Sequence, residues 1–206
     1  MIPLMIDFTG KKVIIFGGGV VGARKARYFA HEAEVVVYSR SFHQDFHEIP
    51  VRTEVCNLTG DQKTLQQMIQ HASLVIAATS DSELNSVIKN VCNRENIWCN
   101  IAAGTRGDVV LPAKISGDRY VIAVSTIGSV PAISRLIREE LEHSFPDLDD
   151  LILLGEWIRN TYRGDRQGTD SYDAVLYSAL RDPETRKALA TGIEHAKEYI
   201  KRRFAI

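Results

Sequence analysis

The sequence contains little cysteine. Its three cysteines among 206 residues are Cys56, Cys92 and Cys99, and no two of them are spaced as C-x-x-C. An odd number at such spacings argues against both a disulfide framework and a thiolate metal site. We therefore expect free thiols in a reducing cytoplasm and no bound metal ion.

A charge excess and a long hydrophobic run are also missing. Lys and Arg number 25 against 26 Asp and Glu, which gives a net charge of −1. A dedicated nucleic-acid binder carries a basic excess, so no such partner is expected. No apolar run reaches the roughly 18 residues that span a bilayer, and the N-terminus lacks the basic region of a signal peptide. We predict a cytoplasmic protein that does not bind membranes.

Several catalytic motifs are absent as well. The six histidines include no H-E-x-x-H, and the chain has no G-x-S-x-G. These absences argue against a zinc protease and an esterase of the α/β-hydrolase type. No tyrosine is followed four residues later by lysine, the pair that a short-chain sugar or alcohol dehydrogenase would carry.

The first half of the chain alternates short apolar runs with helical patterns. Residues 12–16 are a continuous apolar run, the helical spacing of small residues begins at Val20, and residues 35–38 form a second β-branched run. The alternation continues with strands at 51–55, 74–78 and 98–101 and helices at 61–71 and 82–95. Such alternation predicts an α/β fold with a Rossmann-type, doubly wound parallel sheet.

After residue 105 the pattern changes. Residues 109–111 and 120–124 have the composition of strands, and a helix is expected from Pro131. The remainder shows only helical periodicity, at 148–162, 172–180 and 183–204, with a loop at 164–168. We predict three parts: a dinucleotide-binding domain (1–112), a small α+β dimerisation region (113–144) and a helical C-terminal domain (145–206).

The glycine-rich turn after the first strand matches G-x-G-x-x-G. Gly17, Gly19 and Gly22 follow a predicted strand and open a predicted helix. In that context the glycines allow a tight turn and close approach of the backbone to a pyrophosphate, which would lie at the helix start near Val20 and Val21. The alternative is a glycine-rich turn without a ligand, and the context favours a dinucleotide.

The second strand ends without the acidic residue that usually binds the adenosine ribose. Ser39, Arg40 and Ser41 stand there instead. The serines could bind ribose hydroxyls, and Arg40 could stack on adenine, pair with a 2′-phosphate or remain solvated. The motif alone leaves NAD and NADP open.

Two further strand ends supply candidate residues. Thr79 follows the strand at 74–78, where it would contact the cofactor, although the residues after it also suit an ordinary helix cap. Asn100 ends the next strand and is a second candidate cofactor contact. Asp108, the one acidic residue of the loop that follows, is a candidate general base or a turn-forming aspartate.

These motifs, in their order and spacing, resemble the dehydrogenase module of siroheme synthases and the precorrin-2 dehydrogenases. The resemblance covers residues 4–143. It rests on Gly17-Gly18-Gly19-x-Val21-Gly22-x-Arg24-Lys25-Ala26, Ala77-Ala78-Thr79-x-Asp81 with Asn85, Cys99-Asn100, Leu111-Pro112-Ala113, Ala123-Val124-Ser125-Thr126-x-Gly128-x-x-Pro131 and Arg135-Leu136-Ile137-Arg138-Glu139.

The resemblance implies transfer of a hydride from precorrin-2 to NAD, giving sirohydrochlorin for siroheme. It implies a homodimer whose intersubunit region is the central strands and the helix after them. Arg135 and Arg138, together with Thr126, would bind the carboxylates of the tetrapyrrole, and Ser125 is a second catalytic candidate beside Asp108.

One departure from the family pattern matters. Members that also insert Fe²⁺ carry an aspartate three residues after the asparagine that matches Asn100, and this chain has Ala103 there. Hydride transfer depends chiefly on cofactor placement, so we expect a dehydrogenase without appreciable ferrochelatase activity. Asp108 or solvent would then accept the proton. The alternatives are a bifunctional dehydrogenase and chelatase, or a non-catalytic dimer that senses NAD.

Overall fold

The computed structural model describes residues 1–102, 107–126, 130–165 and 169–204, with the backbone alone for residues 162–173. The chain divides into two compact units, Met1–Leu111 and Pro112–Ile206. Ala103, singled out by the sequence, lies outside the described residues.

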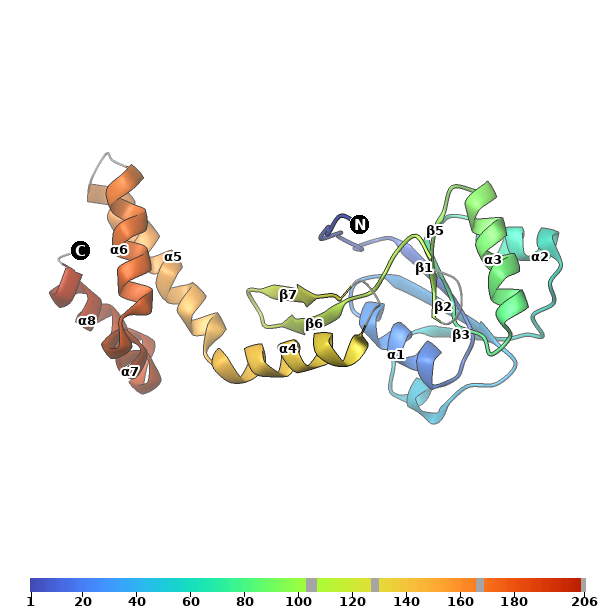
Figure 1. The fold of residues 1–206 in the computed structure, drawn as a ribbon, viewed down its shortest axis with the longest axis horizontal. Coiled ribbons are helices and arrows are strands. Elements are labelled where there is room, and N and C mark those ends of the chain that lie inside the picture. The colour runs from blue at the N-terminus through green and yellow to red at the C-terminus, as the bar shows by residue number, and fades with distance from the viewer. Residues whose placement is uncertain (103–106, 127–129, 166–168, 205–206) are drawn as a thin grey trace. The chain divides into compact units, whose positions relative to one another are not determined.

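The first unit is a parallel α/β sheet (Figure 1). Its strands pair in parallel in the order β3-β2-β1-β4-β5. The predicted doubly wound, Rossmann-type sheet is thereby confirmed. The elements are β1 (Lys12–Phe16), α1 (Val20–Phe29), β2 (Glu34–Ser39), the short 3₁₀ helix η1 (Gln44–His47), β3 (Arg52–Val55), α2 (Gln62–Met68), β4 (Ala72–Ala77), α3 (Ser82–Arg94) and β5 (Trp98–Ile101).

The central strand β1 is buried on both faces, which explains its continuous apolar run. Val13 and Ile15 belong to the cluster that α1 covers, whereas Ile14 and Phe16 belong to the cluster that α2 and α3 cover. All four side chains are fully buried. The chain builds β2 and β3 on one side of β1 and then returns to build β4 and β5 on the other. The carboxyl ends of β1 and β4 therefore meet where the strand order reverses.

The strand predicted at 109–111 is wrong. The hydrogen bonds of this segment do not form a strand ladder, since the N–H groups of Val109 and of the preceding Asp108 both point to the same Cys99 carbonyl, at 3.4 and 2.8 Å. The Val109 carbonyl accepts from the Asn100 side chain, and Pro112 has no N–H to offer. Val109 and Leu111 pack instead against the cluster beneath α1.

The second unit begins with an antiparallel hairpin and continues as helices (Figure 1). β6 and β7 pair from Ala113↔Val124 to Ser116↔Val121. The carboxylate of Asp149 accepts the N–H groups of Asp118 and Arg119 in the hairpin turn. The elements are β6 (Ala113–Ser116), β7 (Val121–Val124), α4 (Pro131–Ser144), α5 (Leu148–Asp165), α6 (Thr169–Arg181), α7 (Pro183–Thr191) and α8 (Ile193–Phe204).

The C-terminal helices differ from the prediction at two places. The single helix expected at 183–204 is broken at Gly192, whose φ of +135° suits glycine and interrupts the helical path. The loop expected at 164–168 is partly wrong, because α5 continues through Asp165, while residues 166–168 lie outside the described part. Among the described helices, none is both long and apolar enough to cross a membrane.

Lys25 is a half-buried cation on the packed face of α1. It shares that face with Gly22, Ala26 and Phe29, which are buried. Burial, with a smaller contribution from neighbouring Arg24, lowers the pKa of Lys25 to about 8. The folded state therefore binds the Lys25 proton less tightly than the unfolded chain does.

We expect Lys25→Met to be more stable than the wild type below pH 8. Between the folded pKa of about 8 and the ordinary value of 10.5, the unfolded chain holds more protons, so wild-type stability rises with pH across this window. The advantage of the variant should therefore shrink between pH 8 and 10.5. Thermal unfolding at pH 7 and 10 measures it, with the exposed Lys63→Met as control; a difference independent of pH would contradict the account.

Candidate functional site

A cavity of about 710 Å³ lies at the carboxyl ends of the central strands. This is the crevice where open α/β sheets bind their ligands, and the volume is that of an ordinary cofactor site. The lining segments follow β1, β2, β3 and β4 in turn; they are Gly17–Val21, Ser39–His43, Asn57–Leu58, and Ala78–Asp81 with Leu84.

The first turn of α1 opens into this cavity without a side-chain cap. Its N-cap residue is Gly19, and the first turn holds no acidic residue. By contrast, the side chains of Asp61 and Asp81 cap α2 and α3. Helix N-termini leave backbone N–H groups unsatisfied and carry a partial positive charge. The start of α1, at Val20 and Val21, is therefore suited to an anionic group.

The glycines of the loop between β1 and α1 are compatible with a dinucleotide bound in this cavity. Gly17 has a φ of +116°, and a Cβ there would collide with the Ala78 carbonyl of the neighbouring strand. A Cβ at Gly22 would collide with the Gly17 carbonyl. A Cβ at Gly19 would meet nothing within 4 Å, so a side chain at that position would enter the cavity. The backbone is thus packed tightly on one side and open on the other, as a pyrophosphate site requires.

The residues at the ends of β2 and β4 lie where the sequence places them. Ser39, Arg40, Ser41 and Thr79 all line the cavity. Asp81 accepts from the N–H groups of Glu83 and Leu84, so the predicted helix cap is present as well.

Thr79 is held by the buried amide of Asn85. Asn85 Oδ1 accepts the Thr79 N–H at 3.2 Å and lies 2.8 Å from Thr79 Oγ1, while Asn85 Nδ2 donates to the Thr79 carbonyl at 3.0 Å. Asn85 is 2% exposed. It positions the cavity wall after β4 without lining the cavity.

Asn100 and Asp108 do not line this cavity. Asn100 is 4% exposed, and its Nδ2 donates to the Val109 carbonyl at 2.7 Å. Its Oδ1 is buried without a hydrogen-bond partner among the described residues. Asn100 thus fixes the chain after β5 and keeps one acceptor unused.

Both carboxylate oxygens of Asp108 accept hydrogen bonds. Lys89 Nζ donates to each at 2.6 Å, and the Cys99 N–H donates to Oδ2 at 3.0 Å. Burial raises the pKa of Asp108, but the hydrogen bonds from Lys89 and the Cys99 N–H outweigh it and lower the pKa overall. A carboxylate in this state is a weak base. Lys89, which belongs to no motif that the sequence analysis singled out, is its main partner.

The predicted substrate residues belong to the second unit. Thr126 lies at the end of the hairpin, where its Oγ1 donates to the Val130 carbonyl and its N–H donates to Ser134 Oγ at 3.1 Å. Arg135 and Arg138 lie on α4 and pair with Glu139 and Glu142 of the same helix. Ser125 is exposed and follows β7. Ser134, which is 8% exposed, was missed because a small hydroxyl residue in a helix carries no sequence signal.

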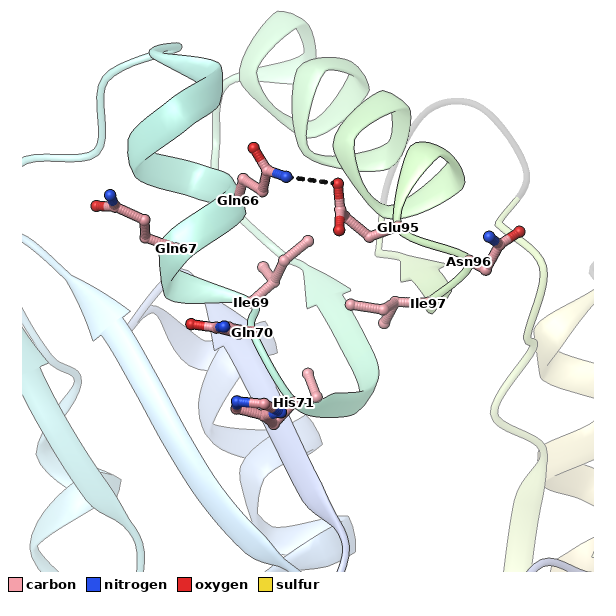
Figure 2. Close-up of a pocket in the computed structure, with 9 residues that line it drawn as sticks. Gln66, Gln67, Ile69, Gln70, His71, Glu95, Asn96 and Ile97 are labelled. Atoms are coloured by element: carbon pink, nitrogen blue, oxygen red, sulfur yellow. Dashed lines mark hydrogen bonds between the residues drawn. The ribbon is translucent and has the colours of Figure 1, made fainter.

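A second cavity, of about 550 Å³, lies at the opposite edge of the sheet, where α2 and α3 end (Figure 2). Gln66 Nε2 donates to Glu95 at 2.8 Å across it. His71 and Asn96 have positive φ, and both follow helix ends, where this conformation is common. Since it leads into the amino ends of β4 and β5, this cavity is not where such sheets bind a dinucleotide. No cluster of three or more His, Cys, Asp or Glu suited to a metal ion occurs in the part of the chain that the structure describes.

Comparison with known proteins identifies the family. The family described as "Putative NAD(P)-binding" matches residues 4–113. A precorrin-2 dehydrogenase of Methanosarcina barkeri is 33% identical over 203 residues, which cover 96% of this chain and 90% of that protein. The chain belongs to the precorrin-2 dehydrogenase family.

A further relative and one solved structure are also similar to this chain. Siroheme synthase 2 of Serratia proteamaculans is 30% identical over 161 residues, 77% of this chain but 34% of that protein. The solved structure of SirC, a precorrin-2 dehydrogenase, superposes with a TM-score of 0.72 at 20% identity, covering 98% of this chain and 100% of that one; it shows the same fold. The predictions of an oxidoreductase family and of NAD as its cofactor are confirmed.

We predict that Gly19→Asp abolishes NAD binding while the protein stays folded. The new side chain has open space and stands at an N-cap position that aspartate favours. Its carboxylate would occupy the pyrophosphate site, where a like charge costs several kcal/mol. Calorimetric titration with NAD measures the loss, and thermal unfolding checks the fold. Unchanged NAD affinity would remove the cofactor from this cavity.

We predict that Asn85→Ala weakens NAD binding several-fold and lowers the free energy of unfolding by about 2 kcal/mol, because the partly buried Thr79 loses its hydrogen-bond partners. Asn90→Ala is the matched control, since Asn90 lies on the same helix but is exposed. Calorimetric titration with NAD and denaturant unfolding of both variants measure these two effects. Equal behaviour of the two would show that Asn85 does not support the site.

Proposed function

We propose that the protein oxidises precorrin-2 to sirohydrochlorin in siroheme biosynthesis. A hydride leaves the substrate for NAD⁺, a proton is released, and NADH is the second product. The observation that carries the proposal is the uncapped start of α1 facing the cavity at the switch point of the sheet. This arrangement, in a chain of the precorrin-2 dehydrogenase family, supports dinucleotide-dependent oxidation.

The chain's own groups would hold the cofactor at three strand ends. The backbone from Gly17 to Gly22, with Val20 and Val21 at the start of α1, would bind the pyrophosphate. Ser39, Arg40 and Ser41 would contact the adenosine. Thr79 would border the nicotinamide end. Asn100, which lies within β5 and does not line the cavity, would support this end through its hydrogen bond to the Val109 carbonyl. When bound, NAD supplies the hydride acceptor, and the protein supplies placement.

The predicted base role of Asp108 is one of two routes for the proton. Its ion pair with Lys89 and its lowered pKa favour the other route, release to solvent. In this account Asp108 positions the chain, because it links α3 through Lys89 to the backbone of β5 at Cys99. Ser125 remains a candidate for contact with the reacting substrate.

The arginines of α4 are suited to an anionic substrate. The ion pairs of Arg135 and Arg138 are exposed pairs within one helix, and such pairs contribute little. Exchange of these partners for the carboxylates of a tetrapyrrole would therefore cost little and give charge-assisted hydrogen bonds. Thr126, whose Oγ1 donates to the carbonyl of the α4 N-cap residue Val130, would contribute beside them.

An apolar stripe on α4 supports the homodimer. Ile133, Leu136 and Ile137 are 43%, 59% and 41% exposed and follow helical spacing. Val121 of β7 is 49% exposed as well. Such a stripe suits contact with a second copy, and we place the dimer in the cytoplasm. Because Ala103 replaces the aspartate of chelatase members, the proposal excludes appreciable iron insertion.

An anaerobic assay with precorrin-2 and NAD tests the proposal. Formation of the sirohydrochlorin chromophore with matching NADH is expected, without acceleration of insertion when Fe²⁺ or Co²⁺ is added. Accelerated insertion would restore the bifunctional alternative. NAD binding without oxidation would favour the sensor. Sedimentation of the same preparation as a monomer would contradict the homodimer.

Asp108→Asn separates the two routes for the proton. If Asp108 positions the chain, the variant should keep kcat within about threefold, with an unchanged pH profile and a lower Tm. A general base contributes roughly 10²-fold or more, so a fall of that size with an altered pH profile would restore the base role. Glu83→Gln, an exposed carboxylate of the same region, is the control.

A further inference from the structure

The adenosine end of the cofactor cavity, formed by Ser39, Arg40, Ser41, His43 and Asn57, contains no carboxylate. In parallel sheets of this type an acidic residue about 20 positions after the glycines binds the ribose 2′-hydroxyl, whereas a nearby arginine accommodates a 2′-phosphate. Ser39 stands at the acidic position, and Arg40 follows it. The chemistry of this end is thus that of a phosphate site.

The acidic residues of the neighbouring elements are engaged elsewhere. Glu54 of β3 accepts from Arg52 Nε at 2.7 Å. Asp45 of η1 pairs with Arg27 at 3.4 Å and faces His43 Nδ1 at 3.0 Å. Neither Glu54 nor Asp45 lines the cavity. Asp81 does line it, but follows β4, and its carboxylate caps α3.

The side-chain donors at the end of β2 make no hydrogen bonds among the described residues, and the backbone that carries them is held in place. Among the described residues, the side chains of Ser39, Arg40 and Ser41 have no hydrogen-bond or ion-pair partner. Their backbone is held at both ends, because the Ser39 carbonyl accepts from the Cys56 N–H at 2.9 Å and the His43 N–H donates to the Gly18 carbonyl at 2.7 Å. A Cβ at Gly18 would collide with Ser39 and Ser41. The segment therefore lies directly against the glycine loop.

We propose that Ser39, Arg40 and Ser41 form a 2′-phosphate subsite, so that the protein binds NADP as well as NAD. The proposal rests on the cofactor assignment of the proposed function and extends it to the phosphorylated dinucleotide. The guanidinium of Arg40 can make two parallel bonds to phosphate oxygens, and the two serine hydroxyls can donate beside it. No carboxylate in this end of the cavity would repel the added charge.

Calorimetric titration of the full chain with NAD, NADP and 2′,5′-ADP tests the proposal; 2′,5′-ADP probes the subsite without the nicotinamide half. NADP should bind within about tenfold of NAD. Arg40→Ala should weaken NADP and 2′,5′-ADP by about tenfold or more, the effect of a lost hydrogen bond to a charged group, and NAD by less than about threefold. Ser39→Asp should abolish NADP binding, whereas NAD should still bind because the new carboxylate can accept from the ribose 2′-hydroxyl in place of the Ser39 contact.

Arg52→Ala is the matched control, because Arg52 is an exposed arginine of the adjacent strand that pairs with Glu54 outside the cavity. It should change none of the three affinities. If NADP and 2′,5′-ADP bind more than about 100-fold more weakly than NAD, the subsite is overturned and the cofactor assignment stands. Equal weakening of NAD binding and NADP binding in Arg40→Ala would also overturn the 2′-phosphate subsite. Failure of both dinucleotides to bind would overturn it together with the proposed function.

Discussion

The close approach of the glycine loop to the end of β4 is the constraint on which the cofactor site depends. Gly17 meets the Ala78 carbonyl and Gly22 meets the Gly17 carbonyl, and neither contact leaves room for a side chain. This approach holds the start of α1 at the switch point of the sheet. The unsatisfied N–H groups of the helix therefore face a cavity rather than a side-chain cap.

A few side chains, most of them buried, hold the chain at the carboxyl ends of the central strands. Burial of β1 on both faces fixes the position of its carboxyl end, and the buried Asn85 fixes the chain after β4. Asp108 and Asn100 do the same after β5, where they bind backbone groups that a regular strand would have paired. Some polar residues that sequence motifs suggest as catalytic or cofactor-binding residues therefore have a structural role.

The buried strands and the glycine loop after β1 were predictable because their sequence patterns are local. A continuous apolar run at 12–16 and the glycines after it determine both the strand and the turn. The segment 109–111 was not predictable from its β-branched residues, because its hydrogen bonds run to the Cys99 carbonyl and the Asn100 side chain, which the residue pattern of the segment does not reveal. The helix break at Gly192 was missed because the apolar spacing continues across it. Lys89 and Ser134 act through single contacts, which periodicity does not reveal.

A crystal structure of the protein with NAD tests the central claim most directly. The account predicts that the pyrophosphate oxygens accept hydrogen bonds from the backbone N–H groups at the start of α1, near Val20 and Val21. It also predicts that the adenosine ribose lies against Ser39 and Arg40. A dinucleotide bound elsewhere, or one whose pyrophosphate leaves the start of α1 uncontacted, would contradict it.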